Sequence, residues 1–368
     1  MGTAFKLPSH ADHVGSLLRP PALTAAFRQF RAGEIDDAAF AAVQDQAITD
    51  AVRLQEEVGL KAITDGEFRR ASYWGRFVER VDGLEVRDAL FRFHDHAGHE
   101  SDFTAPHVAA KVRRSRPIAE DEYLFLSEAT AETAKLTLPS PPTMHFWRLD
   151  QGIDAAAYDS SAAFFDDLAA VYAEEIRHLA GLGLTYVQLD EVPLAMLCDP
   201  AVRERVTAAG LDPARLVDDY IGLFARAIED RPAGMVAAIH LCRGNFKGQF
   251  LSEGGYEEVA EKLFNEIPAD AYFLEYDTPR AGDFAPLRLV PKGKTAVLGL
   301  VSSKTPELEP VDALGRRIDE AARHLALDQL ALSPQCGFAS TVGGNPIAIE
   351  TERAKLALVV RVAEKVWG

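Results

Sequence analysis

Residues 162–191 read AAFFDDLAAVYAEEIRHLAGLGLTYVQLDE, and this stretch decides the fold class. Over residues 162–181 apolar side chains recur every three or four positions and acidic side chains take the remaining face, which is typical of an amphipathic helix. The apolar run at 185–191 then predicts a short buried strand. A helix followed by a buried strand is the repeating unit of a parallel α/β fold.

The same alternation extends along nearly the whole chain. Eight short apolar or β-branched runs predict eight strands, at residues 12–17, 61–67, 134–141, 185–191, 235–242, 271–277, 295–302 and 329–336. Eight β/α units indicate a closed (β/α)₈ TIM barrel, and we expect residues 1–368 to form this single domain. An open doubly wound sheet would alternate similarly, but no glycine-rich phosphate-binding loop follows the first run to favour it.

The connection between the second and third runs is longer than the others. It contains the turn-rich stretch LFRFHDHAGHESDFTAPHVAAKVRRSRP at residues 90–117, which predicts a β-rich insertion over about 77–133. We interpret His94, His96 and His99 in this stretch as solvated or backbone-bonded side chains rather than a second metal site. Because the connection leaves the C-terminal end of a strand, where barrel active sites lie, we expect it to lie near the site.

Charge and cysteine content limit the possible partners. The chain has 56 acidic and 39 basic residues, a formal charge of -17, which disfavours nucleic acid and anionic membranes as main partners. No stretch reaches the roughly 18 apolar residues of a membrane span, and the N-terminus lacks a secretory signal pattern. Because Cys198, Cys242 and Cys336 are too scattered for a disulfide framework, we expect a soluble cytoplasmic protein with free thiols.

Four potential metal ligands lie at the ends of predicted strands. His240 and Cys242 end the run at 235–242, and residues two apart on a strand point the same way. Cys336 ends the eighth run and Glu275 lies near the end of the sixth. The strand ends of one barrel meet at one rim, so these side chains are expected to converge. Two thiolates, an imidazole and a carboxylate are ligands that suit Zn²⁺.

Further carboxylates lie at two other strand ends. Asp65 and Glu67 follow the second run, and Asp190 and Glu191 end the fourth. Each alone has an ordinary interpretation as a rim ion pair or a helix N-cap. Together they indicate recognition of a cation, and the amino group of an amino acid would suit them.

Two further features fit a small polar ligand. Gly15 and Ser16 follow the first run and offer backbone N–H groups and a hydroxyl to a carboxylate, although a plain turn explains them equally well. Trp147 could stack on a ligand ring or pack in the core. The sequence itself leaves both alternatives open.

Taken together, these motifs resemble the catalytic C-terminal domain of cobalamin-independent methionine synthase, and more closely its stand-alone single-barrel relatives. The resemblance spans nearly the whole chain and is carried by DHVGSLLRP (12–20), TDGEFRR (64–70), LPSPPTMHFW (138–147), VQLDE (187–191), HLC (240–242), FLEYD (273–277) and PQCG (334–337). It implies zinc ligands at His240, Cys242, Glu275 and Cys336. It also implies homocysteine contacts at Val14, Gly15, Ser16, Glu67 and Asp190, with Trp147 at the pterin site.

The resemblance implies a methyltransferase that forms methionine. Zinc would hold the thiol of homocysteine as a thiolate, which attacks a methyl group, and Glu275 would be the ligand that gives way. Two positions depart from the family: Val301 stands where a histidine protonates the folate leaving group, and Met196 where a glutamate contacts the pterin. The methyl donor therefore stays open between 5-methyltetrahydrofolate, a methylated corrinoid protein and another small methyl compound.

Two other functions remain as alternatives. One is a zinc-dependent thiol alkyltransferase that acts on another thiol or on an electrophile such as an epoxide. Glu67 and Asp190 disfavour a sulfonate thiol, which has no amino group for them to bind. The other alternative is a non-enzymatic zinc-binding or thiol-binding protein. Structural zinc sites are usually closed and rich in cysteine, so a site with one replaceable carboxylate favours catalysis.

Overall fold

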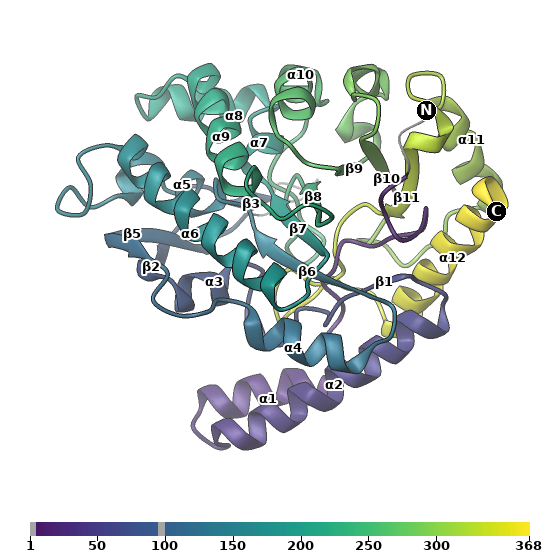
Figure 1. The fold of residues 1–368 in the computed structure, drawn as a ribbon, viewed down its shortest axis with the longest axis horizontal. Helices are drawn as coiled ribbons and strands as arrows, with labels where there is room; N and C mark the ends of the chain where they lie inside the picture. Colours follow the sequence, from purple (N-terminus) through teal and green to yellow (C-terminus); the bar gives the residue numbers. More distant parts are fainter. Residues whose placement is uncertain (1–4, 95–99) are drawn as a thin grey trace.

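The central feature of the fold is one parallel sheet of seven strands. The computed structural model describes residues 5–94 and 100–368. The strand order is β1-β6-β7-β8-β9-β10-β11, with bounds β1 (Ala62–Ile63), β6 (Thr133–Pro139), β7 (Tyr186–Glu191), β8 (Val236–Leu241), β9 (Ala271–Glu275), β10 (Thr295–Val301) and β11 (Leu330–Pro334). The sheet curls, with its strands inside and the helices around them (Figure 1). This is the expected α/β architecture of a TIM-type barrel.

The first expected strand, residues 12–17, is not a regular strand, and this part of the prediction is wrong. Ala11 forms an isolated parallel bridge with Leu332 of β11. Further along, Gly15 adopts φ 137°, outside the strand region, and its carbonyl accepts a hydrogen bond from the hydroxyl of Thr64 at 2.7 Å. The segment thus takes the eighth position, between β11 and β1, through a few backbone hydrogen bonds together with side-chain hydrogen bonds in place of a full ladder.

The remaining seven expected strands are present, although the second is much shorter than the expected range 61–67. Gly66 and Glu67 adopt left-handed conformations with φ 68° and 61°, and these end the extended chain after β1. The other six strands overlap the expected ranges; β7 ends at Glu191 as expected, and the remaining five end one or two residues earlier.

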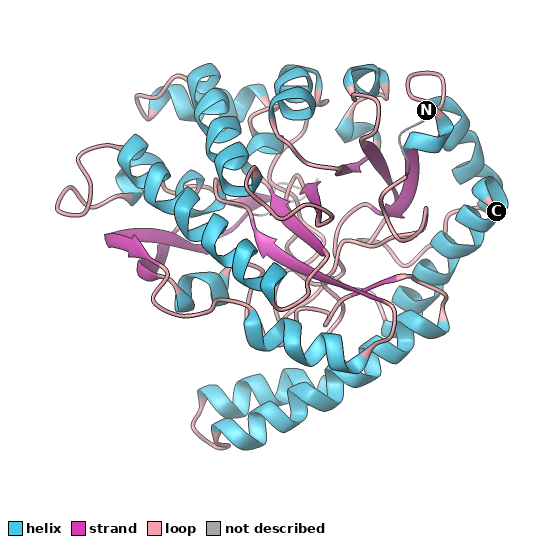
Figure 2. Ribbon diagram, in the orientation of Figure 1, coloured by secondary structure: helices cyan, strands magenta, loops and turns pink. Residues whose placement is uncertain are grey.

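Helices cover the outside of the sheet, as Figure 2 shows in cyan. The expected helix 162–181 is confirmed as α6 (Ser161–Gly181), which begins where Ser160 caps the amide of Ala163. The other helices are α1 (Pro21–Arg31), α2 (Asp37–Glu57), α3 (Gly75–Arg80), α4 (Glu120–Ala129), α5 (Thr143–Phe146), α7 (Pro193–Met196), α8 (Pro200–Ala208), α9 (Pro213–Ile228), α10 (Glu257–Glu266), α11 (Val311–Ala321) and α12 (Ile349–Trp367). Across the described ranges, no helix has the length and apolar character that crossing a bilayer requires.

Between β1 and β6 the chain forms α3, two antiparallel strand pairs and α4. The longer pair joins β2 (Asp82–Asp88) to β5 (Thr104–Arg113), and the shorter joins β3 (Phe93–His94) to β4 (Glu100–Ser101). Helix α4 contacts α2 and β6, so it belongs to the helical layer of the barrel. Of the histidines His94, His96 and His99 in this connection, His96 and His99 lie outside the described residues.

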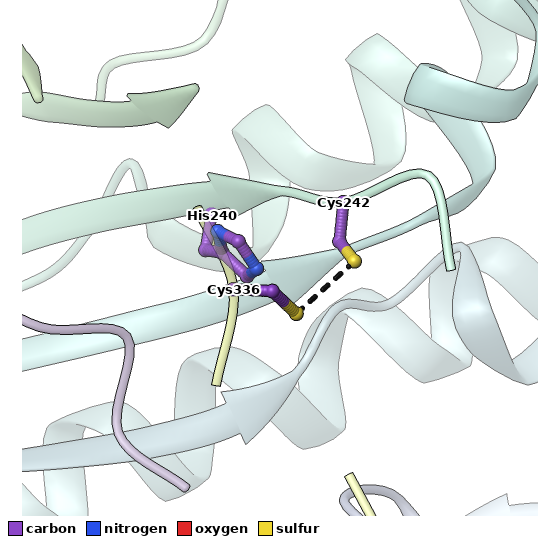
Figure 3. A group of neighbouring side chains, drawn as sticks. All are labelled: His240, Cys242 and Cys336. Atoms are coloured by element: carbon purple, nitrogen blue, oxygen red, sulfur yellow. Dashed lines mark hydrogen bonds between the residues drawn. The ribbon is translucent and has the colours of Figure 1, made fainter. Parts of the chain in front are cut away.

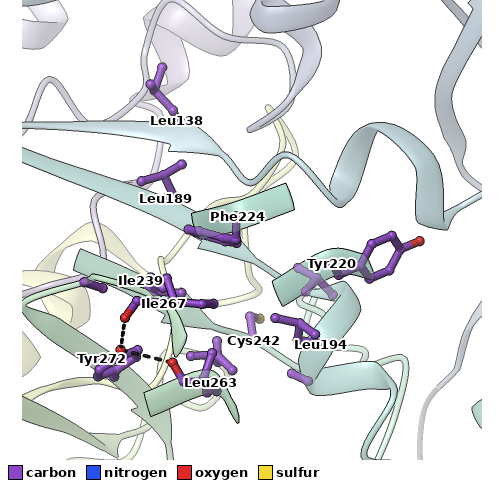
Figure 4. Close-up of a cluster of buried hydrophobic side chains, with 14 of the residues drawn as sticks. Leu138, Leu189, Leu194, Tyr220, Phe224, Ile239, Cys242, Leu263, Ile267 and Tyr272 are labelled. Atoms are coloured by element: carbon purple, nitrogen blue, oxygen red, sulfur yellow. Dashed lines mark hydrogen bonds between the residues drawn. The ribbon is translucent and has the colours of Figure 1, made fainter. Parts of the chain in front are cut away.

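The alternation of side chains along β7 and β8 positions the polar residues. Leu189 and Ile239 point outward and pack with helix residues such as Phe224 of α9 in a buried cluster (Figure 4). Side chains one residue further along point to the opposite side of the sheet. Asp190 and His240 are direct partners in the β7–β8 register, so both carry polar groups towards the barrel interior.

Candidate metal centre and active-site cavity

Three of the four expected metal ligands converge at the C-terminal mouth of the barrel. His240 lies in β8, Cys242 directly follows it, and Cys336 follows β11 (Figure 3). Their ligand atoms lie within 4.8 Å of one another, and all three side chains are buried. Neither ring nitrogen of His240 has a hydrogen-bond partner among the described residues. A buried imidazole without partners is costly, so this group fits a soft divalent cation such as Zn²⁺.

The two thiols are electrostatically coupled. The sulfur atoms of Cys242 and Cys336 lie 3.3 Å apart, within hydrogen-bonding range. This hydrogen bond lowers the pKa of Cys242 well below its ordinary value and raises the pKa of Cys336. One thiolate is therefore already favoured in the site, and a bound cation would favour the second.

Glu275 lies at the end of β9, beside this group, but its carboxylate is directed to other partners. Oε1 forms an ion pair with Arg280, and Oε2 accepts a hydrogen bond from the backbone N–H of Arg243 at 3.1 Å. Burial alone would raise its pKa, yet the charges of Lys304 and Arg280 lower the pKa of Glu275 to about 2. The fourth expected ligand is thus an ionised carboxylate that the structure keeps apart from the other three.

We call His240, Cys242 and Cys336 the metal group. A cavity of about 340 Å³ opens at this group. Eight residues that were expected to bind metal or substrate line it: Val14, Ser16, Glu67, Trp147, Asp190, His240, Cys242 and Cys336. They come from segments that are far apart in the sequence. The cavity therefore combines thiols, an imidazole and carboxylates at one barrel mouth.

Gly15 is not among the lining residues, but it allows the chain to pass closely behind them. A Cβ atom there would lie 2.6 Å from Cγ2 of Thr137 and 3.8 Å from Oε1 of Glu67. Its φ of 137° is also a conformation that side chains disfavour. Glycine is therefore needed at this position for both reasons.

Glu67 is held in a strained backbone conformation. Its φ of 61° is rare for a residue with a side chain and is found most often at functional sites. Arg19 donates to its carbonyl at 2.9 Å, and its amide donates to Asp65 at 2.8 Å. In the cavity, Oε1 accepts from the hydroxyl of Thr137 at 2.9 Å, while Oε2 is buried without a partner in the described part of the chain.

The second cavity carboxylate is Asp190, which accepts a hydrogen bond from Gln188 at 2.7 Å. Burial, and then the charge of Glu67, raise the pKa of Asp190 to about 7. Two neighbouring buried carboxylates would both be favoured in the ionised form by a bound cation. Asp65 and Glu191, the other two expected carboxylates, are not among the lining residues: the former binds the amide of Glu67, and the latter accepts from the first turn of α7.

Four other positions that the sequence analysis discussed have different surroundings. Trp147, directly after α5, lines the cavity, and its indole N–H has no partner within the described residues. Val301 at the end of β10 and Met196 at the end of α7 are fully buried and are not among the lining residues. Cys198 is a buried thiol in the turn after α7, and it donates a hydrogen bond to the carbonyl of Leu194.

The structure adds lining residues that the sequence reasoning did not single out, among them Tyr73 and Asn245. Both residues lie in loops that follow strands whose ends carry expected site residues. Their positions along the chain could therefore have indicated them. Phe103 and Asp102 come from the connection between β1 and β6, which therefore contributes to the cavity.

Comparison with known proteins identifies the family. The family described as "Cobalamin-independent synthase, Catalytic domain" matches residues 10–365. The chain belongs to this family. The cobalamin-independent synthase resemblance inferred from the sequence motifs is thereby confirmed.

Relatives in the cobalamin-independent synthase family match over most of their length. The Bacillus subtilis protein YxjH is 40% identical over 367 residues, which are 98% of this chain and 96% of that protein. A methionine synthase from Pyrococcus abyssi is 24% identical over 88% of this chain and 85% of its own length. A crystal structure titled as a putative vitamin-B12 independent methionine synthase from Listeria monocytogenes is 34% identical, with a TM-score of 0.77 over 100% of this chain and 99% of that one.

Proposed function

We propose that the protein is a zinc-dependent methyltransferase that transfers a methyl group to the thiol of homocysteine and forms methionine. One observation carries this proposal: two thiols and an imidazole that has no hydrogen-bond partner in the described ranges share a cavity with two buried carboxylates. A metal site alone would fit many zinc proteins. The carboxylates beside it add a place for an amino group, which selects an amino acid thiol.

His240, Cys242, Cys336 and Glu275 would hold the metal, with residues 1–368 acting as a single barrel domain. When bound, zinc would lower the pKa of the substrate thiol so that it is a thiolate at neutral pH. The burial of the four ligand side chains limits water around the sulfur. The protein would hold the thiolate in position for attack on the methyl carbon.

The rest of the cavity has a complement for each end of homocysteine. Glu67 and Asp190 would bind the ammonium group, because each presents a buried carboxylate to the cavity. Ser16 and the backbone around Val14 and Gly15 would bind the carboxylate. These contacts would fix the acceptor while its sulfur points towards His240.

The methyl donor would enter next to Trp147, where the indole offers a flat surface. The proposed donors are 5-methyltetrahydrofolate, a methylated corrinoid protein or another small methyl compound. The valine side chain at position 301 has no proton to donate to a leaving group. A donor that departs as a good leaving group would therefore suit this cavity best.

A donor panel tests the proposal. Zinc-loaded protein and homocysteine would be incubated with each donor separately, and methionine would be measured by mass spectrometry. We expect methionine with at least one donor and none with the Cys242→Ser variant. The absence of methionine with every donor, together with alkylation of a different thiol or opening of an epoxide, would favour the alkyltransferase alternative.

A further inference from the structure

Glu275 can pair with Arg280 and the backbone of Arg243, or it can join the metal group as a ligand. Both of its oxygens are engaged away from the thiols, one by Arg280 and the other by the backbone N–H of Arg243. Its carboxylate is nevertheless close enough for its charge to act on both Cys242 and Cys336. The side chain is fully buried, so water does not compete for it.

Arg280 is held firmly beside this carboxylate. Its side chain is 6% exposed, and its guanidinium lies over the ring of Phe250 at 4.4 Å. Its Nε has no hydrogen-bond partner among the described residues, so the guanidinium keeps a spare donor. A buried cation of this kind needs a carboxylate at all times, because an unpaired buried charge is strongly unfavourable.

A second carboxylate, that of Asp277, is available to pair with Arg280. Asp277 lies two residues after Glu275, and both of its oxygens are buried without a hydrogen-bond partner in the described part of the chain. The charges of Lys304 and, to a smaller extent, Arg280 already act on this carboxylate. The two acidic residues therefore offer Arg280 alternative partners on the same side of the barrel mouth.

We propose that Arg280 is a positioning residue that competes with zinc for Glu275, and that it pairs with Asp277 when Glu275 binds the metal. By holding Glu275, Arg280 would keep this carboxylate from binding zinc tightly, so that the thiol of the acceptor could take its place. The inference rests on the zinc site of the proposed function, but it needs neither a particular thiol nor a particular methyl donor.

Zinc dissociation constants, measured by competition with a chelator, test the competition directly. Arg280→Gln should bind zinc about tenfold more tightly than the wild type, because Glu275 is then free to bind. In the Glu275→Gln background, the same substitution should leave zinc affinity unchanged within about twofold. Arg280→Lys retains a cation and should resemble the wild type, as should Arg288→Gln, which removes an exposed arginine paired with Glu257.

A spectroscopic measurement distinguishes positioning from a structural role. In the cobalt-substituted protein, homocysteine should change the visible absorption of the wild type as a carboxylate ligand is replaced by sulfur, and this change should be smaller in Arg280→Gln. Arg280→Gln leaves the charge of Glu275 unpaired and could fold poorly for that reason. The double variant Glu275→Gln, Arg280→Gln removes this unpaired charge, so it serves together with Arg280→Lys as a folded reference protein.

Two results would overturn the inference. Zinc binding that is weaker or unchanged in Arg280→Gln would show that Arg280 does not compete for the carboxylate. Tightening that persists in the Glu275→Gln background would show that it acts on the metal by charge alone. Zinc affinity is measured without any methyl donor, so a failure of methyl transfer to homocysteine would appear separately.

Discussion

The sulfur atoms of Cys242 and Cys336 lie 3.3 Å apart although 94 positions separate the two residues in the sequence. Cys242 follows β8 and Cys336 follows β11, and two further strands, β9 and β10, lie between them in the sheet. The thiols meet because the sheet curls, so that their strand ends face each other across the barrel mouth. The convergence of these two candidate metal ligands therefore depends on the curl of the sheet.

The zinc content of the purified protein should depend on the thiols of Cys242 and Cys336. We expect about one zinc per chain in the purified protein, and a large loss in Cys242→Ser, since thiolates are the strongest ligands of the group. Elemental analysis checks the ratio. The buried Cys198 lies outside the metal group, so Cys198→Ser should keep the metal. Equal zinc content in all three proteins would contradict the site.

Glu275 should contribute less to metal retention than either cysteine. Its carboxylate is already paired with Arg280, so Glu275→Gln should retain more zinc during dialysis against a chelator than Cys336→Ser. The order of the two variants is the test. If Glu275→Gln loses zinc as completely as the cysteine variant, the carboxylate is not the exchangeable ligand.

Asp190 should recognise the amino group of the acceptor. In Asp190→Asn, the loss of a charge-assisted contact should weaken homocysteine binding by about 1.5–3 kcal/mol, roughly ten- to a hundredfold, with zinc retained. A thiol without the amino group should bind the wild type with a similar deficit and lose little more in the variant. Calorimetry with both ligands and both proteins measures this cycle, and additive losses would show that Asp190 does not contact the amino group.

Gly15 should tolerate no side chain. Gly15→Ala places a methyl group against Cγ2 of Thr137 and should cost about 1–3 kcal/mol of unfolding free energy. Thr137→Ser removes that methyl but keeps the hydroxyl bonded to Glu67, so adding it to Gly15→Ala should restore part of the loss. Denaturant unfolding checks both variants. If the double variant is no more stable than Gly15→Ala, the whole loss of unfolding free energy comes from the backbone conformation at Gly15.

Glu352 should make stability depend on pH. Burial raises its pKa from 4.5 to about 8, although Leu18 donates its backbone N–H to it at 2.8 Å. The folded state therefore holds a proton that the unfolded state releases, and stability should fall as pH rises from about 4.5 to 8.

The neutral Glu352→Gln variant keeps an oxygen for Leu18 and lacks this titration. Its stability relative to the wild type should increase by more than about 1 kcal/mol between pH 5 and pH 8. Thermal or denaturant unfolding at both values measures the difference. A constant difference across the range would show that Glu352 is ionised in the folded protein throughout.

Local sequence determined most of the architecture. The helical period at 162–181 and the apolar run at 185–191 match α6 and β7 closely, because amphipathic periodicity reports directly which face of an element is buried. Motifs at strand ends also indicated the residues that line the cavity, since parallel strands of a barrel end at one rim. His240 and Cys242 share a side of β8 for the same local reason.

Other features depended on contacts between distant segments. Residues 12–17 have the composition of a strand, but the conformation of Gly15 and its bond from Thr64 replace the ladder there. Likewise, Glu275 is a reasonable zinc ligand by position, yet its pairing with Arg280 follows from how the loop after β9 folds back. Sequence periodicity records burial and strand direction, whereas the partner of a buried charge is set by the nearest opposite charge in three dimensions.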